Sequence, residues 1–108
     1  MMKRTIFKIL AAGLLTASII PAAHAQDAPK SGYVDANGLS YYYEVSGTGE
    51  PLLFLHGGLM NIDLYAPALQ ELSKDRQVIA VNLQGHGRTA LGSREISLVD
   101  QGADMATV

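Results

Sequence analysis

The residue types best suited to chemistry in this sequence begin at His56-Gly57-Gly58, directly after the apolar run Leu52 to Leu55. A pair of glycines in this place lets the backbone turn sharply and approach a ligand closely. Backbone N–H groups left unpaired there can stabilise a developing negative charge, which is what an oxyanion hole does. This stretch therefore predicts the charge-stabilising half of a hydrolytic site.

A second loop with similar residues, Asn82 to Thr89, follows another expected buried strand, Gln77 to Val81, which is rich in β-branched residues. Residues with a helical pattern connect the two runs, so the segment predicts a strand–helix–strand unit with parallel strands. In open α/β sheets, ligands bind where the carboxyl ends of such strands meet. We therefore expect the two loops to lie side by side at one edge of the sheet.

The elements around these loops are predicted from turn and helix signals. Asn37-Gly38 lies between two strand-like runs, and both residues tolerate positive φ, so the pair predicts a leading β-hairpin. The first apolar run, which lacks polar residues, predicts a strand buried on both faces. The sequence therefore predicts an α/β fold, with a hairpin followed by a parallel strand–helix–strand unit.

Helical spacing predicts which side chains face the core. In the connecting helix, which Asn61 or Asp63 can cap, the expected buried residues are Leu64, Ala68 and Leu72. A last amphipathic helix is expected to begin near Ser97. Its expected buried residues are Ile96, Val99, Ala103 and Ala106.

Residues 1–25 have the pattern of a bacterial signal peptide. The basic residues Lys3, Arg4 and Lys8 precede an apolar run of about 12 residues, too short to span a bilayer as a helix of roughly 20 residues would. Ala23-His24-Ala25 is a small-x-small cleavage site before Gln26. We therefore predict export to the periplasm or the medium without a remaining membrane anchor, a linker at 26–32, and a domain at 33–108.

The amino-acid composition excludes several kinds of site and partner. The sequence contains no Cys, which excludes disulfides, a thiolate nucleophile and Cys-ligated metals. The formal net charge of −2, with no basic patch, argues against nucleic acid as a partner. We expect a small-molecule substrate and no cofactor.

The residues fit two other kinds of site less well. Gly85 to Ala90 fits the dinucleotide fingerprint G-x-G-x-x-A, but a poor helix start follows it, and no acidic residue ends a further strand. His56 and His86 with Asp63 contain ligand types for zinc, but not the spacing of known zinc motifs. We therefore interpret both histidines as residues that shape their loops.

Together, the two loops resemble those of the α/β-hydrolase fold family. His56-Gly57-Gly58 is similar to the family's H-G motif, and Asn82 to Thr89 is similar to its D-x-x-G-x-G-x-S/T loop, with Asn82 in place of Asp. The resemblance covers the N-terminal third of the family's domain. It implies that the backbone of Gly58, or as second candidate Leu59, donates to an oxyanion, while Gly57, Gly85, His86 and Gly87 shape the loops around the site.

The resemblance also shows what this sequence lacks. The family's nucleophile lies in G-x-S-x-G and is followed by an acid and a His, and this sequence contains no such motif. We expect an esterase-type parent enzyme with a Ser-His-Asp triad beyond Val108, and no activity of the 108 residues alone. Epoxide hydrolase, dehalogenase, lactonase and perhydrolase chemistry use the same scaffold. A non-catalytic remnant or binding module is the alternative.

Overall fold

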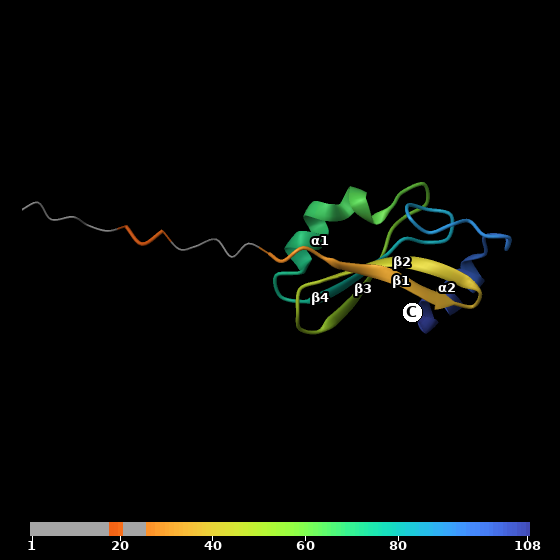
Figure 1. Cartoon of the computed structure of the whole chain (residues 1–108), viewed down its shortest axis with the longest axis horizontal. Coiled ribbons are helices and arrows are strands. Elements are labelled where there is room, and N and C mark those ends of the chain that lie inside the picture. The colour runs from red at the N-terminus through yellow and green to blue at the C-terminus, as the bar shows by residue number, and fades with distance from the viewer. Residues whose placement is uncertain (1–17, 21–25) are drawn as a thin grey trace, which may run out of the picture.

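The computed structural model describes residues 18–20 and 26–108 (Figure 1). Most of the predicted signal peptide, with its basic residues and its cleavage site, lies outside the described residues. Within the described ranges, no helix is long and apolar enough to cross a membrane.

A four-stranded sheet forms the centre of the fold, in the order β1-β2-β4-β3. Its strands are β1 (Lys30–Ala36), β2 (Leu39–Ser46), β3 (Pro51–Leu55) and β4 (Gln77–Val81). β2 pairs with β1 and β4 in antiparallel fashion, whereas β3 and β4 are parallel. The predicted hairpin and parallel pair are confirmed, and β1 begins inside the stretch 26–32 that was expected to be a linker.

The turn between β1 and β2 has the backbone that its sequence predicts. Asn37 has φ 50° and Gly38 has φ 87°, so two successive residues adopt the left-handed region. A turn of this kind matches the twist of the two flanking strands. The turn brings the Asn37 side chain close to the C-terminal helix, where it has a further role.

Helices cover both faces of the sheet (Figure 1). A 3₁₀ turn, η1 (Ile62–Tyr65), leads into α1 (Ala66–Leu72), and α2 (Leu98–Thr107) ends the chain. α1 packs on one face through Leu69, and α2 packs on the other face through Met105. Asn61 caps η1 as predicted, because its Oδ1 accepts hydrogen bonds from the N–H groups of the next turn.

The buried face predicted for α2 was wrong, and that for α1 was right only at Leu72, which is half-buried against the core. Near α1 the buried side chains are Ile62 and Leu69, whereas Leu64 is 65% exposed. The 3₁₀ turn before α1 winds more tightly than an α-helix, so a single 3.6-residue period does not run through both. In α2, Val99 is 82% exposed, and the buried residues are Gln101, Asp104 and Met105.

β3 is an edge strand in the described part of the chain, where β4 alone pairs with it. Leu53 and Leu55 are 43% and 44% exposed, so the prediction of a strand buried on both faces was wrong for β3. β4 instead has the buried position, with Val78, Ala80 and Val81 all covered. The central strand is covered because neighbours flank it on both sides and a helix lies over each face.

Candidate functional site

The two predicted loops lie side by side at the carboxyl ends of the parallel strands (Figure 1). Leu55 and Val81 are partners in the β3–β4 register, so both strands end at the same level. The chain leaves β3 into His56-Gly57-Gly58 and leaves β4 into Asn82. The expected meeting of the two loops is therefore confirmed.

His56 connects its own loop to the second loop through both ring nitrogens. Nδ1 lies 2.7 Å from the carbonyl oxygen of Gly57, and Nε2 accepts a hydrogen bond of 2.9 Å from the N–H of Leu83. Because a carbonyl oxygen can only accept, the proton must be on Nδ1, which leaves the lone pair of Nε2 for Leu83. The ring is 5% exposed, so it is a buried bridge between the loops.

His86 makes the same kind of bridge in the opposite direction. Its Nδ1 lies 2.8 Å from the carbonyl oxygen of Gln84, and its Nε2 accepts a hydrogen bond of 3.1 Å from the N–H of Leu59. The two imidazole rings have their centroids 5.1 Å apart. In this arrangement both Nε2 lone pairs accept from backbone N–H groups, so neither is directed at a metal ion.

The two candidate oxyanion donors differ in their environment. The N–H of Leu59 is engaged by His86, and Leu59 has the unusual φ of 61° for a side chain that is 98% exposed. The N–H of Gly58 has no hydrogen-bond partner among the described residues. A Cβ built on Gly58 would meet no atom within 4 Å, so the backbone there is open to a ligand. This difference favours Gly58 over Leu59.

The second loop is fixed to the sheet by Asn82 and Thr89. The Thr89 hydroxyl donates to the carbonyl of Asn82 at 2.7 Å and accepts from the N–H of Tyr42 at 2.9 Å. The Asn82 Oδ1 accepts the N–H of Ile62 at 3.0 Å, whereas its buried Nδ2 has no partner in the described residues. Asn82 therefore orders the start of η1 with one of its two polar side-chain atoms.

The glycine-rich loop does not open a helix, as a dinucleotide-binding loop does. The first helix after Gly85-His86-Gly87 is α2, which begins at Leu98. Gly85 and Gly87 have φ values of 75° and 53°, and their role in this structure is to close a compact turn. The N–H of Gly85 donates to the carbonyl of Ala90 at 3.2 Å.

Replacing Gly87 by alanine is expected to lower the free energy of unfolding by about 2 kcal/mol, through overpacking and a left-handed backbone. A Cβ at this position would lie 2.3 Å from Nδ2 of Asn82, whose side chain is fully buried. Urea denaturation of both proteins measures the change. Gly38→Ala is the matched control, since Gly38 also has positive φ but no atom within 4 Å of a Cβ. Equal losses in both variants would contradict the predicted clash.

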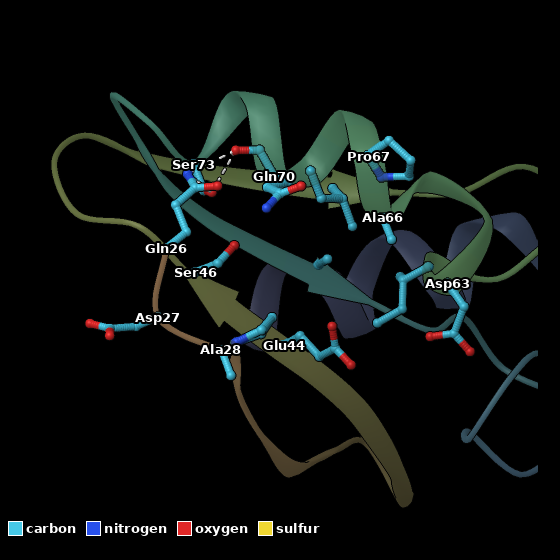
Figure 2. A pocket seen from close by; sticks show the side chains of 14 residues that line it. Gln26, Asp27, Ala28, Glu44, Ser46, Asp63, Ala66, Pro67, Gln70 and Ser73 are labelled. Carbon is cyan, nitrogen blue, oxygen red and sulfur yellow. Dashed lines mark hydrogen bonds between the residues drawn. The ribbon is translucent and has the colours of Figure 1, made fainter. Parts of the chain in front are cut away.

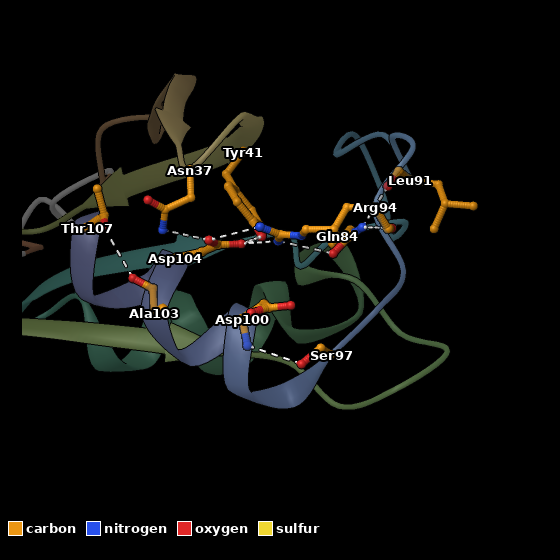
Figure 3. Close-up of polar contacts among 10 residues, drawn as sticks. All are labelled: Asn37, Tyr41, Gln84, Leu91, Arg94, Ser97, Asp100, Ala103, Asp104 and Thr107. Atoms are coloured by element: carbon orange, nitrogen blue, oxygen red, sulfur yellow. Dashed lines mark hydrogen bonds and ion pairs between the residues drawn. The ribbon is translucent and has the colours of Figure 1, made fainter.

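A buried polar cluster behind the second loop was not predicted from the sequence (Figure 3). Asp104 of α2 is completely buried and accepts hydrogen bonds from Tyr41, Asn37 and Arg94. Its bond with Asn37 is 2.9 Å long, and Arg94 also forms an ion pair with it. The sequence signal for this cluster is an acidic residue between two apolar residues, Ala103 and Met105.

Gln84 connects this cluster to the loop. Its Nε2 donates to the carbonyls of Leu91 and Arg94 at 2.8 and 2.7 Å, and its Oε1 accepts from Arg94 at 3.3 Å (Figure 3). The carbonyl of Gln84 faces the ring of His86. Polar contacts thus run continuously from Asp104 through Arg94 and Gln84 to the histidine that contacts Leu59.

The cluster shifts the ionisation of two of its members. Hydrogen bonding from Arg94, followed by Tyr41 and Asn37, lowers the pKa of Asp104 from 3.8 to about 2, against the opposing effect of burial. Burial and the nearby Asp104 carboxylate raise the pKa of Tyr41 from 10.0 to about 12. Both groups therefore keep their neutral-pH forms, a carboxylate and a phenol, over a wider range of pH.

A pocket of about 410 Å³ lies away from the two loops (Figure 2). The segment from Gln26 to Pro29 borders it on one side, and α1 and β2 border it on the other. Gln26 donates to the carbonyl of Gln70 at 3.0 Å and to the Ser73 hydroxyl at 3.2 Å. None of the predicted site residues lines this pocket.

Solved structures with this arrangement of strands and loops include hydrolytic enzymes. A haloalkane dehalogenase from Agrobacterium tumefaciens superposes with a TM-score of 0.67 at 29% identity, over 74% of this chain and 28% of that chain. An N-formylmaleamic acid deformylase from Pseudomonas putida gives 0.66 at 28%, over 70% and 31%. The chain has the α/β-hydrolase fold. It corresponds to the N-terminal part of that fold.

Curated relatives of this α/β-hydrolase chain are hydrolases as well. The (E)-2-((N-methylformamido)methylene)succinate hydrolase of Acinetobacter baylyi is 33% identical over 64 residues, which are 59% of this chain and 24% of that protein. The pimeloyl-[acyl-carrier protein] methyl ester esterase of Aliivibrio salmonicida is 37% identical over 57 residues, 52% of this chain. The chain spans 24% and 22% of these relatives' lengths. No protein-family model matches it.

Proposed function

We propose that this chain supplies the oxyanion-stabilising loop of an exported esterase that acts on small acyl substrates. In this enzyme the N–H of Gly58 donates to the oxyanion. A Ser-His-Asp triad is supplied by sequence beyond Val108. The predicted export rests on the sequence pattern of residues 1–25.

The unpaired N–H of Gly58 is the observation that carries this proposal. It lies in an exposed turn at the carboxyl end of β3, and the neighbouring Leu59 N–H is already held by His86. A fixed donor beside an open backbone stabilises charge that develops on a substrate oxygen, without reorganising during the reaction. The geometry therefore suits a reaction in which a carbonyl oxygen becomes negative.

The edge of β3 supports a larger sheet around this loop. Leu53 and Leu55 are apolar and nearly half exposed, and the outer backbone edge of β3 has no partner strand in the described part of the chain. Long apolar edges promote aggregation, and parallel strands are normally covered on both faces. A further strand on this edge would cover it and would end beside Gly58, where a nucleophile is needed.

Acyl chemistry is favoured over the other reactions of this fold by the relatives. The protein from Aliivibrio salmonicida, at 37% identity, is a methyl ester esterase. Carboxylic ester hydrolysis passes through a tetrahedral intermediate with an oxyanion, which is the charge that the N–H of Gly58 would stabilise. A carboxylic ester of a small acyl group is therefore the substrate class that we propose.

An ester assay with and without the downstream sequence tests this function. The 108-residue chain is expected to hydrolyse p-nitrophenyl acetate no faster than buffer, because it lacks a G-x-S-x-G nucleophile. The chain extended by the sequence that follows Val108 in the gene is expected to hydrolyse the ester well above that background. Activity of the 108 residues alone, or no G-x-S-x-G after a strand in the extension, would contradict the proposal.

A further inference from the structure

The two histidines form a reciprocal pair that joins the two loops. Each ring donates a hydrogen bond from its Nδ1–H to a carbonyl of its own loop. Each ring also accepts, at Nε2, a hydrogen bond from a backbone N–H of the other loop. The two contacts at Nε2 are not equivalent, however. The contact of His56 is with Leu83 in the second loop, whereas the contact of His86 is with Leu59, directly after the proposed donor Gly58.

Leu59 has a conformation that its own side chain does not explain. A φ of 61° is unfavourable for a leucine, and this residue is 98% exposed, so no burial offsets the strain. The hydrogen bond from its N–H to His86 is a local interaction that can hold it. The same bond occupies the second candidate oxyanion donor and leaves the N–H of Gly58 unpaired.

We propose that His86 is the positioning residue of the oxyanion loop, acting through Leu59 to present the N–H of Gly58 to substrate. This inference rests on the proposed function for its catalytic meaning. In structural terms, the Nε2 lone pair of His86 holds the backbone of the first loop in place by accepting the N–H of Leu59. Gln84, whose carbonyl faces Nδ1 at 2.8 Å, fixes the tautomer that makes this lone pair available.

Amide hydrogen exchange in the ¹⁵N-labelled chain tests this contact without any assay of activity. His86→Ala is expected to speed exchange of the Leu59 amide about tenfold, which corresponds to the loss of one hydrogen bond. The Leu83 amide, which His56 holds, and the amides of β4 are internal controls that should keep their rates. His86→Gln is expected to restore protection of Leu59, because its amide oxygen is an acceptor at the reach of Nε2.

The unmodified protein provides a second measurement if His86→Ala does not fold. Its ¹⁵N ring shifts are expected to show His86 with a protonated Nδ1 and a bare Nε2. The opposite tautomer would overturn the proposal. So would unchanged exchange at Leu59 in His86→Ala, or an equal acceleration at Leu59, Leu83 and β4, which would indicate general destabilisation. An inactive extended enzyme with the expected exchange pattern would refute the proposed function and leave this contact in place.

Discussion

Replacing Asp104 by asparagine is expected to lower the free energy of unfolding by about 3 kcal/mol. A loss of this size is typical when one partner of a buried ion pair is removed. The Asp104 carboxylate accepts from Tyr41, Asn37 and Arg94 and is fully buried. An asparagine of the same shape has an NH₂ group in place of one carboxylate oxygen, so it accepts fewer hydrogen bonds from these partners, and it leaves the Arg94 guanidinium without its counter-charge. Urea denaturation at neutral pH measures the loss.

Asp100→Asn is the matched control for this change. Asp100 lies on the same helix but is exposed, and its own role is in the first turn of α2. Removing a charge there weakens only the interaction with the helix dipole, which is worth at most about 1 kcal/mol. Similar losses in the two variants would show that the buried cluster has no special contribution to stability.

The dependence of stability on pH gives an independent check of the same cluster. The pKa of Asp104 falls from 3.8 to about 2 on folding, so its contribution is complete above pH 3.8 and is lost as the pH falls towards 2. The pKa of Tyr41 rises from 10.0 to about 12, so its contribution is complete below pH 10 and is lost as the pH rises towards 12. Asp104→Asn should remove the acidic loss of stability that is specific to this group.

Local signals made the fold largely predictable from the sequence. The Asn37-Gly38 turn, the apolar runs and the Asn61 cap depend on residues close together in the chain, and the structure confirms each of them. The packing of the helices was not predictable in this way. Asp104 turns towards Tyr41, which lies 63 residues away in the sequence, and with this face of α2 inward, Leu98 and Val99 are exposed.

The site was predictable as a pair of loops but not as a network. His56-Gly57-Gly58 and the loop after Asn82 stood out because glycines and histidines follow apolar runs. The hydrogen bonds between the two loops depend on the β3–β4 register, which cannot be read from the sequence. The sequence therefore located both histidines without indicating that each accepts a backbone N–H from the opposite loop.

The largest effect on catalysis is expected at Gly58, in the enzyme formed with the sequence after Val108. Gly58→Pro removes the N–H and is expected to lower kcat about 100-fold, equivalent to about 3 kcal/mol of transition-state stabilisation. KM should change little, because the bond strengthens mainly when the carbonyl oxygen becomes negative. Steady-state kinetics on p-nitrophenyl acetate separate the two constants.

Gly58→Ala provides the comparison that assigns this loss to the N–H rather than to the side chain. Alanine retains the donor, the φ of Gly58 is not positive, and a Cβ there meets no atom within 4 Å. The alanine enzyme should therefore keep kcat near that of the parent, and the melting temperatures of the two variants should agree. Equal losses of kcat in both variants would mean that the loop needs glycine for its shape, and that another group holds the oxyanion. A large loss in proline alone would identify the backbone donor as the contribution of this chain to catalysis.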